Sequence, residues 1–390
     1  MNGTTTAEEG RRSSNLELFL DLVFVFAVTQ VTRVIEAGAD WPSFIHGVLL
    51  AWLVWWMWSQ LVWLGTAVDL EHNTWGQLVV IAAVVPTLLM AVAVPTAQQG
   101  GGPAFGVSYL IAQGVALVAM GSLMRHVDSA RQAFVRYAGL AVGGPVLVFV
   151  AGFVGTPGRQ WLWLLGALFG TGGALLTGRV DRTQMGWSID PTHFAERHSL
   201  FVIIALGEVL VGIGAVATER GVTAEVVVGL AATVAVACAL WWIYFAYLPR
   251  LTEERLRRVQ FGDRASVARN LFTFGHFPVV LGVILYAIVA EHVTAHPTEH
   301  LHSREVALLG AAVVLFVGSL MAFHWTYNRG VAPERVVAIA GIAVLLLVAG
   351  ERLDPRVLVA SVAAVLAVMH LVTVARLATR LAAHEPSRSD

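Results

Sequence analysis

Apolar stretches of about twenty residues recur along the whole chain, separated by short polar segments. A helix of this length crosses the hydrocarbon core of a bilayer, which is about 30 Å thick. Hydrophobic residues make up 57% of the 390 residues and charged residues only 13%, and the mean hydropathy is +0.71. This pattern predicts an all-α membrane protein that crosses the bilayer many times.

The apolar stretches separate into twelve candidate membrane-spanning helices. The sixth and the eleventh are the shortest, and the sequence leaves open whether they cross fully. The expected limits are 16–34, 43–64, 76–95, 105–124, 134–153, 161–178, 197–217, 224–247, 270–290, 305–325, 334–350 and 355–375.

The two halves of the chain resemble each other weakly. The first span (ELFLDLVFVFAVTQV) and the seventh (ERHSLFVIIALGEVL) both start with Glu, and a Trp-rich span follows each. We therefore expect two parallel six-helix repeats, an arrangement in which binding sites lie at the repeat interface near mid-membrane. The predicted organisation is a tail at 1–15, repeats at 16–182 and 183–378, and a tail at 379–390. The aromatic residues that match between the halves are Trp55, Trp56 and Trp58 with Trp241, Trp242 and Tyr244.

The basic residues predict the orientation. All 25 are Arg, and with twelve spans nineteen of them fall on the side of the N-terminus. Because basic loops stay in the cytoplasm, both termini are expected to be cytoplasmic, in a bacterial inner membrane.

Several classes of function lack support in the sequence. The single cysteine, Cys238, excludes a disulfide framework and a cysteine-based metal cluster. A phosphate-binding glycine loop, a nucleophile elbow and a zinc-protease motif are absent, so no cofactor and no metal are predicted. The formal net charge of −1 gives no sign of nucleic-acid binding. The expected partners are the lipid bilayer and a small ion or small-molecule substrate, and self-association is left open.

Two carboxylates lie inside the first apolar stretch. At 100° per residue, Glu17 and Asp21 fall on one helical face, so both are expected to point into the bundle. Acids in membrane spans are expensive and mark functional sites by default. For Glu17 the alternative is an interfacial role at the first helical turn, where the helix dipole favours an anion.

The seventh span carries the second polar group. His193, Arg197 and Glu208 share a helical face, and Glu196, Arg197 and His198 lie at its cytoplasmic end. An ion pair of Arg197 with Glu17 or Asp21 would be a structural or gating contact, joined by Glu196 and His193. That pairing leaves Glu208, near the middle of its span, as a candidate for binding an ion or a proton.

Histidines provide the remaining candidates. His276 lies about two turns into the ninth span beside Pro278, where it could relay a proton or be a satisfied core residue. The outer loop AEHVTAHPTEHLHSRE could bind a metal, but Pro297 interrupts its helical face. We therefore expect a loop that is exposed to water. The proposed ion site therefore consists of Asp21, Glu208 and His276.

The motifs ELFLDLVFVFAVTQV and HFAERHSLFVIIALGE resemble the bacterial low temperature requirement A family from about residue 11 to 375. One departure is Ser199, where the family usually has Gly. The resemblance implies a polytopic membrane protein whose molecular activity is poorly defined. The residues that it singles out are Glu17, Leu18, Phe19, Asp21, Leu22, His193, Glu196, Arg197, Leu206, Gly207, Glu208, His276 and Pro278.

Three function classes follow as hypotheses. The first is a cation- or proton-coupled transporter or channel with a buried carboxylate site between the first, seventh and ninth spans. Arg12 and FLDLVFVFAV also resemble, loosely, the first span of potassium channels built from six-span repeats, with Leu20 and Leu22 in place of the motif's Ser and Gly. The second is an intramembrane enzyme that uses Asp21 or Glu208 with His276 on a lipid or isoprenoid. The third is a non-catalytic membrane stress-response protein.

Overall fold

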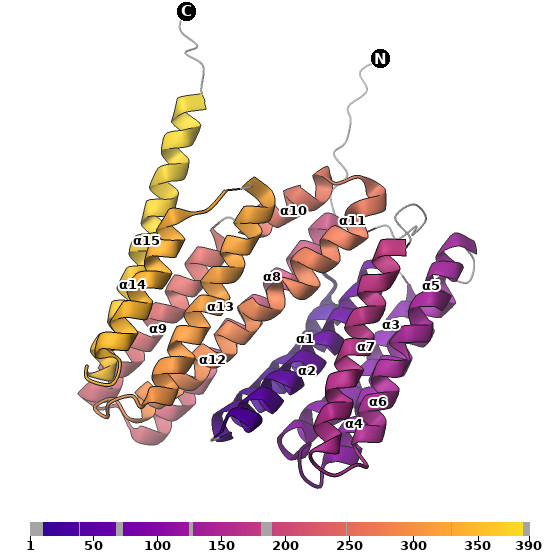
Figure 1. Ribbon diagram of the computed structural model, residues 1–390, viewed down its shortest axis with the longest axis horizontal. Coiled ribbons are helices and arrows are strands. Elements are labelled where there is room, and N and C mark those ends of the chain that lie inside the picture. Colours follow the sequence, from indigo (N-terminus) through magenta and orange to yellow (C-terminus); the bar gives the residue numbers. More distant parts are fainter. Residues whose placement is uncertain are drawn as a thin grey trace, which may run out of the picture. The chain divides into compact units, whose positions relative to one another are not determined.

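The computed structural model describes residues 11–38, 40–67, 73–124, 128–180, 189–246, 248–328 and 330–384. Helices account for nearly all of these residues, and the described ranges contain no β-strand (Figure 1). The expected all-α class is confirmed. The helices are α1 (Asn15–Ala37), α2 (Trp41–Ala67), α3 (Thr74–Ala93), α4 (Gly102–Met124), α5 (Asp128–Ala141), α6 (Gly143–Ala151), α7 (Gly158–Val180), α8 (Pro191–Arg220), α9 (Ala224–Phe245), α10 (Leu248–Arg258), α11 (Phe261–Ala268), α12 (His276–Ala295), α13 (Ser303–Asn328), α14 (Pro333–Ala349) and α15 (Pro355–His384), with short turns η1 (Val94–Thr96) and η2 (Arg269–Phe274).

Nine helical stretches within the described residues are long and apolar enough to cross a membrane. Each of the twelve predicted spans coincides with helix, but three fall outside this group. The fifth is divided at Val142 into α5 and α6, the sixth is α7, and the eleventh is the 17-residue α14. The multi-pass membrane fold is therefore established, while the count of twelve and the duplication stay predictions.

The chain forms two compact units. The first contains residues 1–201 and 250–277, and the second contains residues 202–249 and 278–390. The division passes through α8 and falls close to the start of α12, so one end of each helix belongs to each unit. These units come from contacts in space, whereas the predicted repeats come from likeness in sequence, and the repeat boundaries remain a prediction.

In the first unit, α1 packs against α2 and α3, and α4 packs against α3 and α6. Close approach of α6 to α7 depends on glycine, since a Cβ at Gly144 would lie 2.9 Å from the Gly166 carbonyl oxygen. The glycine-rich LGALFGTGGALL segment thus lets two backbones touch, as small residues do at helix contacts in membranes.

In the second unit, α9 packs against α15, and α14 packs against both α13 and α15. A Cβ at Gly282 of α12 would lie 2.8 Å from the Ala312 carbonyl oxygen of α13. Tyr286 donates its hydroxyl hydrogen to the Thr233 carbonyl at 2.5 Å. Small residues and backbone-directed hydrogen bonds thus join these helices too.

Local sequence sets where the two site-bearing helices begin. Ser14 caps α1, because its hydroxyl accepts from the Glu17 backbone N–H while the Glu17 carboxylate accepts from the Ser14 N–H. Asp190 precedes α8 and accepts from the backbone N–H of Thr192 at 2.9 Å. Pro191 then occupies the first turn, where its missing N–H costs nothing.

Candidate functional site

The two carboxylates of α1 are buried in the first unit against the beginning of α8. Asp21 and His193 have no exposed surface, and Arg197 and Glu17 expose only 1% and 4%. We call Glu17, Asp21, His193 and Arg197 the charge network. Its members come from positions 176 residues apart in sequence, so the fold, not local structure, assembles it.

Asp21 and Arg197 form the centre of the charge network. Arg197 Nη1 lies 2.6 Å from Asp21 Oδ2, and Arg197 Nη2 lies 2.7 Å from Asp21 Oδ1. The Trp58 indole N–H donates to the same Oδ1 at 2.9 Å. This is a two-pronged, charge-assisted contact of the strongest kind, and it occupies both carboxylate oxygens.

Glu17 holds the second half of the charge network. Its Oε2 accepts from both the backbone N–H and the hydroxyl of Ser14, at 2.9 and 3.0 Å. His193 Nε2 lies 3.0 Å from Oε1, and Arg197 Nε lies 3.8 Å from that oxygen. One guanidinium therefore faces two carboxylates, tightly at Asp21 and loosely at Glu17.

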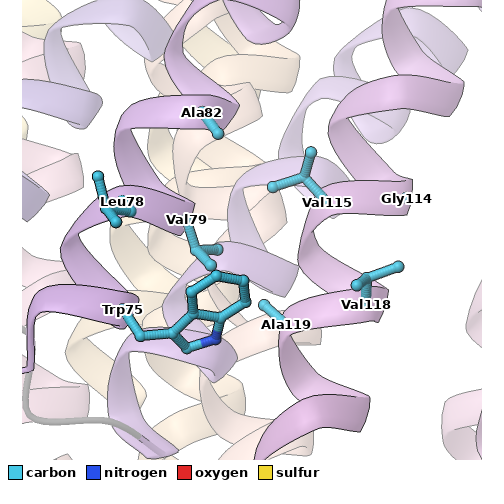
Figure 2. Close-up of a pocket in the computed structure, with 8 residues that line it drawn as sticks. All are labelled: Trp75, Leu78, Val79, Ala82, Gly114, Val115, Val118 and Ala119. Atoms are coloured by element: carbon cyan, nitrogen blue, oxygen red, sulfur yellow. The ribbon is translucent and has the colours of Figure 1, made fainter.

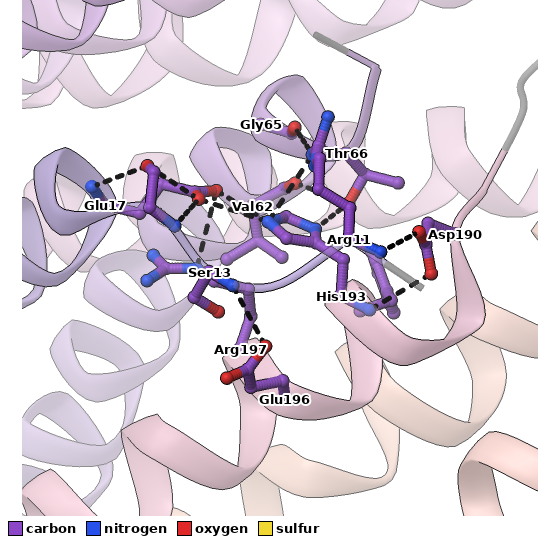
Figure 3. A network of polar contacts seen from close by, with 12 residues as sticks. Arg11, Ser13, Glu17, Val62, Gly65, Thr66, Asp190, His193, Glu196 and Arg197 are labelled. Carbon is purple, nitrogen blue, oxygen red and sulfur yellow. Dashed lines mark hydrogen bonds and ion pairs between the residues drawn. The ribbon is translucent and has the colours of Figure 1, made fainter. Parts of the chain in front are cut away.

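Figure 3 shows His193 between Glu17 and the residues that close this end of the site. Thr66 of α2 places its hydroxyl 3.3 Å from His193 Nδ1. The Arg11 backbone N–H donates to Asp190 at 2.7 Å, and its side chain donates to the Gly65 carbonyl. The segment before α1 is thus tied to the start of α8 and the end of α2.

Two further histidines lie against the charge network. His198 follows Arg197 on α8, and its ring centroid lies 5.3 Å from that of His276 at the start of α12. His198 Nδ1 donates to the Phe194 carbonyl at 2.8 Å, and His276 Nδ1 donates to the Leu271 carbonyl at 3.0 Å. His198 Nε2 has no hydrogen-bond partner among the described residues. We call His198 and His276 the imidazole pair.

Aromatic rings surround His198. The rings of Phe194, Trp58 and Phe272 lie 4.8, 5.0 and 5.0 Å away between centroids, and Trp55 lies 6.0 Å away. Trp residues in membrane spans are commonly interfacial anchors or core packing. Trp55 and Trp58 are 2% and 0% exposed, and Trp58 also binds Asp21, so this part of α2 lines the candidate site.

A π-helical turn, η2, leads into His276. Wide turns of this kind leave main-chain carbonyls without their usual helical partner and are common at functional sites. Here Leu271 offers its carbonyl to His276, and Thr273 offers its carbonyl to Trp55 Nε1 at 2.7 Å. The Thr273 hydroxyl accepts from Trp63 Nε1 at 3.1 Å. Side chains of α2 and α12 thus satisfy the turn and fix the imidazole.

Two of the sequence candidates are not among the residues whose contacts define the charge network. Glu196 accepts from the Ser13 backbone N–H at 2.9 Å, which makes it a tether for the segment before α1. Glu208 is half-buried in the part of α8 that belongs to the second unit, and it takes part in an interaction. The expectation that Glu208 is left without a partner is therefore wrong. Ser199, the departure from the family pattern, donates to the Ala195 carbonyl at 2.8 Å.

Several members of the site were outside the sequence-based candidates: Arg11, Trp58, Thr66, Asp190 and, as a binding group, His198. Trp58 and Thr66 are uncharged and lie in an apolar stretch, where nothing separates them from core residues. His198 adjoins Arg197 in sequence, and a second imidazole beside a buried Arg was the one signal that could have selected it.

The histidine-rich loop is held by local contacts. His296 Nδ1 lies 3.2 Å from Glu299, and His300 Nδ1 donates to the Leu353 carbonyl at 3.0 Å. In the described part of the chain, no three His, Cys, Asp or Glu side chains are placed to hold a metal ion.

An apolar pocket of about 520 Å³ lies between α3 and α4 (Figure 2). Trp75 closes one end, where its indole N–H donates to Ser122 at 3.3 Å. No member of the charge network lines it, and its walls hold no charged group. Its lining is Trp75, Leu78, Val79, Ala82, Gly114, Val115, Val118 and Ala119.

Comparison with known proteins identifies the family. Residues 12–375 match the family described as bacterial low temperature requirement A protein (LtrA). A relative from Rhizobium meliloti (strain 1021), named "Uncharacterized protein RA0937", is 27% identical over 317 residues, which cover 79% of this chain and 76% of the relative. No solved structure matches the chain. The chain therefore belongs to the bacterial low temperature requirement A family of multi-pass membrane proteins.

Proposed function

We propose that this protein is a cation- or proton-coupled transporter or channel of the bacterial inner membrane, with the charge network as its ion-responsive gate. The observation that carries the proposal is the burial of two carboxylates, an arginine and a histidine in membrane-spanning helices, each within 3.8 Å of a partner. The predicted orientation, with both termini cytoplasmic, belongs to the same proposal.

The energetics favour a role for the charges beyond holding helices together. Removing each ion from water costs several kcal/mol, and well-packed apolar residues often hold a core together at least as well as a buried ion pair. In pumps and transporters, ionisable side chains at such positions form proton relays and ion pathways.

Arg197 supplies two alternative arrangements. Its Nη1 lies 2.6 Å from Asp21 Oδ2, and its Nε lies 3.8 Å from Glu17 Oε1. A shift of the guanidinium toward Glu17 would weaken its contact with Asp21. An ion that binds in the site would favour one of these two arrangements, and the other would return when the ion leaves. The gate thus has two states that an ion can bias, which is the minimum that coupling requires.

The test is ion flux in proteoliposomes that contain the purified protein. We expect the native chain to carry a flux of protons, Na⁺ or K⁺ that is lost in Asp21→Asn. The matched control is Asp263→Asn, which neutralises an exposed aspartate outside the charge network and is expected to keep the flux. If the native protein carries no ion under any gradient, the proposal is overturned, and assays for bound lipid would follow.

A further inference from the structure

We infer that the coupling ion is a proton and that His198, rather than a carboxylate, is the group that binds it. This inference rests on the proposed function and names the ion that the site recognises. It is carried by three observations: occupied carboxylates, an imidazole nitrogen without a partner, and an indole that contacts both.

The carboxylate oxygens of Asp21 and Glu17 are already occupied by hydrogen-bond donors, so they have little room to bind a further ion. Asp21 accepts from both terminal nitrogens of Arg197 and from Trp58, and Glu17 accepts from Ser14 and His193. A Na⁺ or K⁺ ion exchanges its hydration shell for several oxygen ligands, which these side chains do not offer while so bound. Protonating Asp21 directly would leave the Arg197 charge buried without its counter-ion.

His198 offers what the carboxylates do not. A backbone carbonyl only accepts hydrogen bonds, so the contact with Phe194 fixes the hydrogen on Nδ1 and leaves the lone pair of the neutral ring on Nε2. That nitrogen has no partner among the described residues, and the side chain has no exposed surface. A buried acceptor left empty in this way is costly unless it is used.

The enclosure of His198 selects the smallest ligand. Phe194, Phe272 and Trp58 pack against the ring at centroid distances of about 5 Å or less, with no surface left open. A proton adds one N–H bond and almost no volume. The proton is donated by a hydronium ion, which becomes water. When the N–H bond breaks, the proton returns to a water molecule.

The charges around His198 set the conditions for this proton. Arg197 and His193 on α8 and His276 on α12 oppose a second positive charge, whereas Asp21 and Glu17 on α1 favour it. The carboxylates are neutralised only while Arg197 stays on them, so protonation of His198 and displacement of Arg197 are linked.

Trp58 connects the proton site to the gate. Its indole N–H binds Asp21 at 2.9 Å, and its ring lies against His198 at 5.0 Å between centroids. A positive His198 would repel the neighbouring Arg197 and would also act on the indole that binds Asp21. Proton binding would therefore loosen the Asp21–Arg197 pair, which is the shift that the proposed gate requires.

The first arm of the test reads the proton directly. Protein labelled with ¹⁵N-histidine and held in lipid bilayers is followed by solid-state NMR while the pH is lowered from about 8 through the range in which transport changes. We expect one buried imidazole to gain a proton on Nε2, and its signal to be absent in His198→Phe and His198→Gln. A His198 that stays neutral over the range in which transport changes would overturn the inference.

The second arm reads transport in proteoliposomes. We expect proton flux in the native chain, its loss in both His198 variants, and its retention in His300→Gln, which removes an exposed imidazole in the second unit. The Phe and Gln side chains differ in shape and in hydrogen bonding, so a packing defect would not affect the two His198 variants alike. Flux of Na⁺ or K⁺ without proton flux would refute the inference and leave the proposed function standing, whereas no flux of any ion would refute the proposed function.

Discussion

At the scale of single residues, the pairing of Asp21 with Arg197 is the contact on which the site depends. Both side chains are buried, so each neutralises a charge that would otherwise remain in an apolar interior. Truncating one partner of such a pair costs about 3 to 5 kcal/mol, because the other is left uncompensated.

We therefore predict that Asp21→Asn and Arg197→Gln each lower the unfolding temperature of the purified protein, and that the double variant recovers most of the loss. Neutralising both partners removes the buried charge while keeping side chains that can hydrogen bond to each other. Thermal unfolding in detergent of the two single variants, the double variant and the native chain measures this. Equal losses that add in the double variant would show that the two charges do not depend on each other.

The sequence predicts the charged half of this site well and the uncharged half poorly. Glu17, Asp21 and Arg197 stand out because charge is rare in apolar stretches, and helical periodicity places the two acids on one face. Trp58 and Thr66 belong to the same contacts, but their partners come from other helices. Sequence periodicity orders residues around one helix and says nothing of which helix lies opposite.

At the scale of helices, hydropathy places each predicted span on helix but does not show where a helix is interrupted. Hydropathy predicts one helix from 134 to 153, whereas the structure divides this stretch between α5 and α6 at Val142. Hydropathy also does not indicate the π-helical turn before His276. Both depend on what packs against the backbone, and neither leaves a signature in hydrophobicity.

Close helix packing gives a prediction of its own. Gly144→Ala should destabilise the protein by about 1 to 3 kcal/mol, because its Cβ would meet the Gly166 carbonyl oxygen at 2.9 Å. Gly172→Ala, on α7, is the matched control: no atom lies within 4 Å of its added Cβ, so it should be neutral or stabilise by up to about 1 kcal/mol. Chemical unfolding of both variants checks this, and equal effects would show that α6 and α7 are not in contact at Gly144.

The start of α15 gives a pH dependence outside the membrane spans. Asp354 accepts from the Arg356 side chain and backbone N–H, and these hydrogen bonds lower the pKa of its carboxyl. Because the folded-state pKa is depressed, its stabilising contribution is present above the ordinary Asp pKa of about 3.9 and is lost as the pH falls through the lower folded-state value.

Asp354→Asn should therefore lower the unfolding temperature at neutral pH and reduce its loss on acidification below about pH 4. Asn remains a good helix cap, so the variant removes the charge more than the cap. Unfolding temperatures of both proteins across this pH range are the measurement. Parallel curves for the native chain and the variant would mean that the Asp354 carboxylate contributes no acid dependence.

At the scale of the whole molecule, the arginine distribution predicts that both ends of the chain lie on one side of the membrane. Nineteen of 25 Arg fall on that side if there are twelve crossings. With Cys238 replaced by Ser, single cysteines at Arg12 and Ser389 should both react with a membrane-impermeant thiol reagent only from the cytoplasmic face. Labelling from opposite faces would require an odd number of crossings.

The central claim is that the charge network serves transport and not merely stability. Proton flux in proteoliposomes, measured for Asp21→Asn, Arg197→Gln and the double variant at equal amounts of folded protein, tests it most directly. The account predicts that the double variant recovers stability but stays without flux, because a neutral pair has no charge for an ion to compete with. Flux restored together with stability in the double variant would contradict the account and make the pair a structural contact alone.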